Sequence, residues 1–167
     1  MTELEFSRRI ALDTIGAGER DEDFAATRDE RDALARRFDW LAVDELKGRA
    51  RLARVAGGVR ATGRLHATIV QSCVATGAPV RESIDEAFDL HFVEGLATPE
   101  SEEVELGESE LDTLPIEGGA IDLGEAAAQT VALAANPYPR CADADDVNLT
   151  AGPANGAFAG LKGLIRP

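Results

Sequence analysis

A regular alternation of small or apolar residues with polar residues runs through the middle of the chain. It covers residues 44–70 and is interrupted at Gly57-Gly58. A period of two is typical of strands with one buried face, and glycines accept the backbone of a tight turn. We therefore predict a long β-hairpin in which residue 56 pairs with residue 59. This register places three non-polar pairs opposite each other: Leu46 and Ile69, Ala50 and Leu65, and Leu52 and Gly63.

The polar face of this predicted hairpin is basic, because residues 47–64 include six basic residues and no acidic one. The predicted register places Arg51 opposite Arg64 and Arg49 opposite His66, and like charges directly across a sheet are destabilising. Such a face can be a solvated surface with counter-charges nearby, or a contact surface for an anion or RNA. Five residues are the candidates for RNA or partner binding: Lys47, Arg49, Arg51, Arg60 and Arg64.

The N-terminal part contains weaker patterns. Residues 4–12 alternate in part, which predicts a first strand, and the Gly- and acid-rich residues 16–26 predict a loop. Thr27 is followed three positions later by Glu30, which is the spacing of a capping box. We therefore predict a helix over residues 28–38.

The C-terminal half contains a third long strand, predicted over residues 80–93 from two sets of alternating positions. Short strands are predicted at 104–106 and near 120–121. A capping-box-like start at Asp122 predicts a buried helix over residues 123–135. Residues 142–157 have the composition of a disordered segment.

These elements define one α+β domain over residues 1–141, with a flexible tail over 142–167 that ends in a short amphipathic segment. We expect a curved antiparallel sheet of five or six strands and two main helices. The pattern leaves open whether the sheet closes into a barrel.

Charge is distributed unevenly along the 167 residues, whose net charge is −14. Residues 1–83 are neutral overall, whereas residues 84–150 contain 17 acidic residues and one basic residue, Arg140. An excess of acid argues against a general nucleic-acid coat protein. We see no signal peptide and no apolar stretch of membrane-spanning length. We therefore expect a cytoplasmic protein with no membrane partner.

Residues that could carry catalysis are scarce. His66 and His91 fall on polar faces of predicted strands, and no serine lies in a nucleophile-elbow motif. We therefore predict no enzymatic activity, no cofactor and no small-molecule substrate. Zinc sites usually contain close pairs of ligands, whereas Cys73 and Cys141 are far apart in the sequence. We predict no metal site and a buried free thiol at Cys73.

Four segments resemble a known family. The stretch from Cys73 to Val80, CVATGAPV, resembles the C-x-x-C-L-x-P-V-like stretch of the YceD family, the large ribosomal RNA subunit accumulation proteins. GAIDL at 119–123, the proline-ended segment 133–139 and the tail 155–162 are similar to later family motifs, in the same order. The resemblance covers residues 43–165. Its motif residues here are Cys73, Pro79, Val80, Asp122, Leu123, Phe158 and Leu161.

The resemblance implies a non-catalytic factor that supports accumulation of 23S rRNA and thus ribosome biogenesis, but it supplies no mechanism. The family has been linked to metal and nucleic-acid binding, partly through its cysteines. In this chain Thr76 stands where many members have the second cysteine, and Cys141 has no nearby second cysteine. Four thiolates cannot be assembled, so zinc binding is the weakest of the functional alternatives.

Two kinds of partner fit this sequence. The first is a precursor of large-subunit rRNA, contacted through the five basic candidates. The second is a basic ribosomal protein, contacted by the acidic half of the chain, with residues 158–165 docking as a short helix. An acidic adaptor unrelated to RNA is a further alternative.

Overall fold

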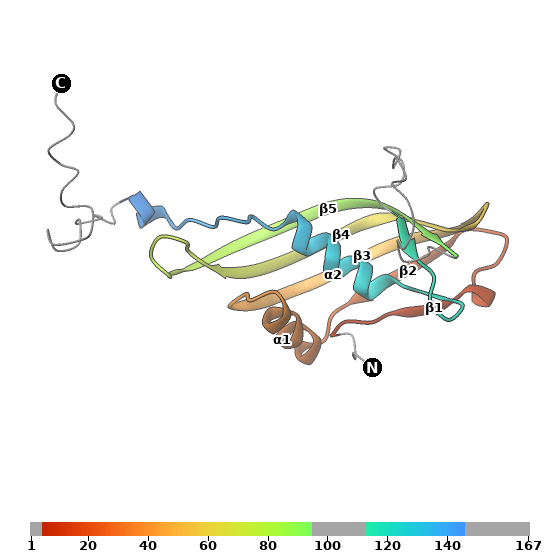
Figure 1. Ribbon diagram of the computed structural model, residues 1–167, viewed down its shortest axis with the longest axis horizontal. Helices are drawn as coiled ribbons and strands as arrows, with labels where there is room; N and C mark the ends of the chain where they lie inside the picture. The colour runs from red at the N-terminus through yellow and green to blue at the C-terminus, as the bar shows by residue number, and fades with distance from the viewer. Residues whose placement is uncertain (1–4, 95–112, 146–167) are drawn as a thin grey trace, which may run out of the picture.

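The computed structural model describes residues 5–94 and 113–145 of the chain (Figure 1). Five strands form the main sheet in chain order: β2 (Arg20–Ala25), β3 (Ala42–Val55), β4 (Gly58–Ser72), β5 (Pro79–Val93) and β6 (Thr113–Pro115). Every pairing is antiparallel except that of β5 with β6. The two outer strands of this order do not pair with each other, so the sheet is open and is not a barrel.

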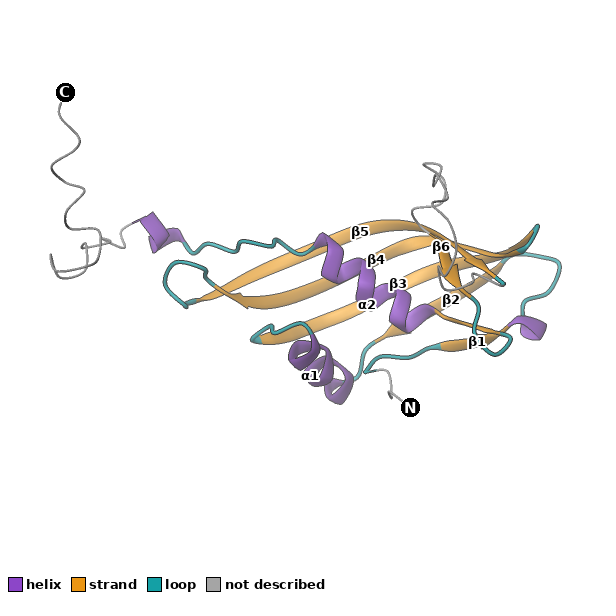
Figure 2. Cartoon of the chain, in the orientation of Figure 1, coloured by secondary structure: helices purple, strands orange, loops and turns teal. Residues whose placement is uncertain are grey.

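A second, two-stranded sheet pairs β1 (Arg9–Ala11) with β7 (Ala120–Asp122). The helices are α1 (Arg28–Arg37) and α2 (Leu123–Ala134), and two short 3₁₀ helices span Leu12–Thr14 and Ala142–Asp145. The α+β class and the two main helices are therefore confirmed. In Figure 2, α2 lies across the long strands and α1 lies beside the edge of the sheet.

The core lies between α2 and the alternate residues of the long strands that point to one face of the sheet. These strand residues are small or aliphatic in β3 and β4, whereas β5 adds two phenylalanines, Phe88 and Phe92. Helix α2 contributes Ala126, Ala127 and Val131, all at most 3% exposed. Burial of this apolar face, at about 25 cal/mol per Å², is the main favourable term that holds the helix on the sheet.

Helix α1 begins where the capping box predicted. The Thr27 side chain accepts a hydrogen bond from the Glu30 backbone N–H, and the Glu30 carboxylate accepts one from the Thr27 N–H. Two otherwise unpaired donors of the first turn are thereby satisfied. Leu34, which is 1% exposed, points into the core from the middle of this helix.

The hairpin of β3 and β4 exists, but its predicted register is wrong by two residues. Val55 pairs with Gly58, so the turn consists of Ala56 and Gly57. Of the two glycines, only Gly57 has a positive φ, at 83°. Gly58 is needed for a different reason, since an added Cβ would lie 1.8 Å from the Phe92 carbonyl oxygen of β5.

Because the period of a strand is two, this shift keeps every residue on its predicted face but changes its partner. Leu46 pairs with Ala67, Ala50 with Gly63 and Leu52 with Ala61. On the polar face Arg49 lies opposite Arg64, Lys47 opposite His66 and Arg51 opposite Thr62.

The N-terminal predictions were less accurate. Strand β1 covers only Arg9–Ala11 of the strand predicted at 4–12, and β2 lies within residues 16–26, where a loop was expected. Strand β2 has a single buried side chain, Phe24, so it lacks a hydrophobic alternation. Its partner β3 stabilises it through opposite charges across the edge of the sheet.

The later elements agree with the sequence. The third long strand, the short strand at 120–121 and the helix that follows are all present within one or two residues of their predicted bounds. The strand expected at 104–106 lies outside the described residues, as does the tail beyond residue 145.

Candidate functional site

The candidate basic residues lie on the face of the sheet opposite α2, which we call the charged face. It consists of Asp21, Asp23, Lys47, Arg49, Arg51, Arg60, Arg64, His66, Asp85 and Asp89. The structure brings all five candidates together on β3 and β4. It also places acidic side chains on both flanks, from β2 and from β5.

Each arginine nearest to β2 has an aspartate directly across the pairing. Arg49 makes two hydrogen bonds to Asp23, of 2.5 Å from Nε and 3.0 Å from Nη2. Arg51 Nε lies 3.0 Å from Asp21 Oδ1. Since Asp21 and Asp23 have the same spacing as Arg49 and Arg51, one register satisfies both pairs.

The other flank repeats this arrangement. Arg60 Nε donates to Asp89 Oδ1 at 2.8 Å, and its second nitrogen reaches the other oxygen. His66 Nδ1 lies 3.0 Å from Asp85 Oδ1 of β5. Lys47 pairs within its own strand, where its Nζ lies 2.6 Å from Glu45 Oε1. Hydrogen bonds from the guanidinium groups lower the pKa of Asp23 and of Asp89.

Arg64 differs from the other four candidates. It is exposed, lies between Arg49 and Ala87 in the sheet, and makes no hydrogen bond or ion pair with any described residue. Four of the five basic candidates are therefore paired with carboxylates of the same chain. The interpretation of a solvated face with nearby counter-charges describes this geometry.

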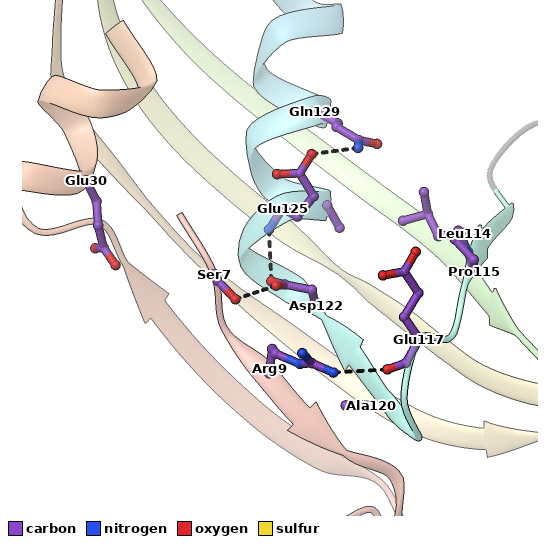
Figure 3. Close-up of a pocket in the computed structure, with 11 residues that line it drawn as sticks. Ser7, Arg9, Glu30, Leu114, Pro115, Glu117, Ala120, Asp122, Glu125 and Gln129 are labelled. Atoms are coloured by element: carbon purple, nitrogen blue, oxygen red, sulfur yellow. Dashed lines mark hydrogen bonds between the residues drawn. The ribbon is translucent and has the colours of Figure 1, made fainter. Parts of the chain in front are cut away.

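A hollow of about 590 Å³ lies at the start of α2 (Figure 3). Four carboxylates line it together with one cation, Arg9: Glu30, Glu117, Asp122 and Glu125. The Arg9 guanidinium donates to the Glu117 carbonyl oxygen at 3.1 Å. The hollow is thus acidic, and several of its polar groups form hydrogen bonds with residues 7–9 of the N-terminal segment.

Asp122 shows this structural role most clearly. Its carboxylate accepts hydrogen bonds from the backbone N–H groups of Gly124 and Glu125, at 3.0 and 3.1 Å, and so caps α2. It also accepts from the Arg8 N–H at 2.9 Å and from the Ser7 hydroxyl. The motif residue Asp122 therefore joins the helix start to the first strand, and Leu123 beside it is 1% exposed.

Glu30, at the edge of the same hollow, gives a pH-dependence prediction. The Arg8 guanidinium, 2.6 Å away, lowers the pKa of Glu30 from 4.5 to about 2. Since the folded state has the lower pKa, its stabilisation is complete above pH 4.5 and is lost as the pH falls toward 2. We expect a loss of about 1–3 kcal/mol over this range.

The test is denaturant unfolding between pH 2 and 6. The Glu30→Gln variant keeps a residue that serves at this capping position, and its stability should depend less on pH than that of the wild type. Glu94→Gln is the matched control, because Glu94 is exposed and pairs with no described residue. Equal pH profiles for Glu30→Gln and the wild type would contradict the assignment.

Two cysteines that are far apart in the sequence meet at the end of the sheet. Cys73 directly follows the last residue of β4 and is 3% exposed, as predicted for a buried free thiol. Cys141 Sγ lies 3.2 Å from Cys73 Sγ and 3.2 Å from Thr76 Oγ1. Neither the local sequence pattern nor the family resemblance predicted this proximity, since the two cysteines are 68 positions apart.

This cluster does not fit a structural zinc ion. Such an ion takes four ligands from Cys, His or carboxylate side chains, whereas two sulfurs and the Thr76 hydroxyl are available here. Within residues 5–94 and 113–145, no three His, Cys, Asp or Glu side chains are grouped closely enough to hold a metal.

The remaining motif residues are structural or lie outside the described chain. Pro79 and Val80 begin β5 opposite the last residues of β4. Phe158 and Leu161 fall outside the described residues. In the part of the chain that the structure describes, no helix combines the length and apolarity that crossing a membrane requires.

The protein is thus an α+β protein with an open sheet, one face of which is covered by α2 while the other is the charged face with its ion pairs. A family model described as "Large ribosomal RNA subunit accumulation protein YceD" matches residues 61–161, more than half of the chain. The chain therefore belongs to the YceD family, as the resemblance predicted. Searches of curated proteins and of solved structures gave no match. The family description connects the chain with accumulation of large-subunit ribosomal RNA.

Proposed function

We propose that this chain is a non-catalytic accessory factor in the accumulation of large-subunit rRNA, and that it acts by contact with a basic ribosomal protein. The observation that carries the choice of partner is the pairing of Arg49, Arg51 and Arg60 with carboxylates. A phosphate group would have to displace these carboxylates before it could bind. The charged face therefore favours RNA contact less than its sequence suggested.

The acidic half of the chain supports the protein partner. Residues 84–150 contain 17 acidic residues and one basic residue, and the exposed part of this surplus includes Glu86 and Glu94. Opposite surface charge speeds the encounter of two proteins and selects among partners. Ribosomal proteins rich in Lys and Arg are the class of partner that such a surface attracts.

The experiment compares binding of the full chain to large-subunit rRNA fragments and to purified basic ribosomal proteins over a range of salt concentrations. We expect the wild type to bind one of the proteins and no rRNA. The triple variant Asp21→Asn, Asp23→Asn, Asp89→Asn removes the nearest carboxylate from three arginines and should gain RNA binding, although Arg51 keeps Glu19 at 3.5 Å. The slope of log K against log salt should then be about −2.

A matched control removes the same number of charges elsewhere. Asp13, Asp32 and Asp39 are exposed and pair with no described residue, so their triple Asn variant should not gain RNA binding. Exposed ion pairs are each worth at most about 1 kcal/mol, so both variants should fold. Salt-dependent RNA binding by the wild type, abolished by Arg49→Ala with Arg51→Ala, would overturn the choice of a protein partner.

A further inference from the structure

The close approach of Cys73 and Cys141 has no role in the proposed contacts. The two residues are 68 positions apart, and their sulfur atoms are separated by 3.2 Å. They are the chain's two cysteines. We infer that Cys73 and Cys141 form a reversible intramolecular disulfide when the protein meets a low-molecular-weight disulfide.

The surrounding backbone already holds the two cysteines in place. The Val74 N–H donates to the Pro139 carbonyl oxygen at 2.9 Å, and the Cys141 N–H donates to Cys73 Sγ at 3.3 Å. The turn that carries Cys73 is fixed by its own hydrogen bond to Ala78, of 2.8 Å. A disulfide bond is about 2.05 Å long, so the sulfurs need to approach by only about 1.1 Å.

A second set of hydrogen bonds fixes the segment after α2 against the long strands. Gln71 Nε2 donates to the Asn136 carbonyl oxygen at 3.0 Å, and the Asn136 N–H donates to the Glu82 carboxylate. Figure 1 shows this segment running past the turn between β4 and β5. The reduced protein thus presents both sulfurs in an arrangement close to that of the oxidised one.

The two thiols have different environments, which suits them to different steps. Cys73 is buried, and the Cys141 backbone N–H, followed by the Thr76 side chain, lowers the pKa of Cys73 to about 6. Cys141 is half-buried and is the more accessible of the two to a reagent. Cys141 Sγ donates to Cys73 Sγ, so the Cys73 thiolate can take up the Cys141 proton and leave the more accessible sulfur as the attacking nucleophile, while Cys73 resolves the mixed disulfide.

The exchange proceeds in two steps. Cys141 sulfur attacks one sulfur of the reagent RSSR while its proton passes to Cys73, and RS⁻ leaves and is protonated by water. Cys73 then loses the proton to water and attacks the Cys141 sulfur, which forms the Cys73–Cys141 bond and releases the second RS⁻, and this RS⁻ takes up a proton from water. The two cysteines are oxidised by two electrons in total, and RSSR is reduced to two thiols.

The disulfide would lock the segment Asn136–Cys141 to the turn between β4 and β5. It closes a loop between residues 73 and 141, and long loops of this kind lose much of their unfolded-state freedom. We expect the midpoint of thermal unfolding to rise by about 5 °C or more on oxidation.

The test incubates the full chain with oxidised glutathione at neutral pH, followed by intact mass and thiol counting without reductant. The wild type should lose both thiols and two hydrogen masses, form no disulfide-linked dimer, and recover its thiols with excess dithiol. Cys73→Ala, which suits a buried site, should instead keep one glutathione bound at Cys141. Cys141→Ser should react at least about tenfold more slowly, because Cys73 is buried.

Three outcomes would overturn the inference. The wild type could keep bound glutathione as its final product, or form a disulfide-linked dimer. It could also retain both thiols under conditions in which Cys73→Ala takes up glutathione. Each result means that the two sulfurs do not react with each other inside one chain.

Discussion

Asp122→Ala is expected to destabilise the protein by about 3 kcal/mol. Loss of a helix cap costs about 0.5–2 kcal/mol, and Asp122 caps α2 through the N–H groups of Gly124 and Glu125. The same substitution leaves the Arg8 N–H and the Ser7 hydroxyl without their acceptor. Unsatisfied buried or half-buried donors add about 1–3 kcal/mol.

Urea unfolding followed by circular dichroism measures this loss. Asp122→Asn keeps one oxygen acceptor and remains a good cap, so it should cost less than half as much as Asp122→Ala. Asp32→Ala, on the exposed side of α1, is the control and should change stability by no more than about 0.5 kcal/mol. If Asp122→Ala matched this control, Asp122 would not be the link between α2 and the first strand.

Gly63→Ala is the second large effect, at about 3 kcal/mol or complete loss of folding. Gly63 lies in the middle of β4, between β3 and β5. A Cβ added there would lie 2.1 Å from the Arg49 carbonyl oxygen and 2.7 Å from the Phe88 ring. The Phe88 ring can turn aside, but the backbone of β3 can move only if its pairing with β4 is weakened.

Gly18→Ala is the matched control, because nothing lies within 4 Å of the position that its Cβ would take. Its stability should equal that of the wild type or exceed it slightly, since alanine restricts the unfolded chain more than glycine does. The comparison uses denaturant midpoints and the yield of soluble protein. A Gly63→Ala variant as stable as Gly18→Ala would mean that β3 and β4 are farther apart than described.

The parts of the fold that the sequence predicted are those in which burial follows a simple period. Residues 44–70 and 80–93 alternate because one face of each strand lies in the core beneath α1 and α2, and the capping residues Thr27 and Asp122 act within a few positions of their helices. These signals are local, so a single sequence reveals them.

The features that the sequence did not reveal depend on partners that are distant in the chain. Four of the six residues of β2 are charged, and it forms a strand because Asp21 and Asp23 meet arginines of β3. The register of the hairpin depends on which glycine lies in the two-residue turn. Gly58 lies in β4 and not in the turn, where it is in close contact with the backbone of β5. The Cys73–Cys141 contact could not be predicted for the same reason, because the two residues are distant in the chain and meet only in the complete fold.

The pairing of β1 with β7 has a consequence for synthesis of the chain. Strands β3, β4 and β5 are neighbours both in sequence and in the sheet, so they can pair once residue 93 has left the ribosome. Strand β1 can pair only after β7 has been synthesised, because Ile10 lies opposite Ile121 in the two-stranded sheet. Among the described strands, the first to be translated is therefore the last to be paired, and during elongation its apolar side chain Ile10 and the nearby Phe6 stay accessible to chaperones.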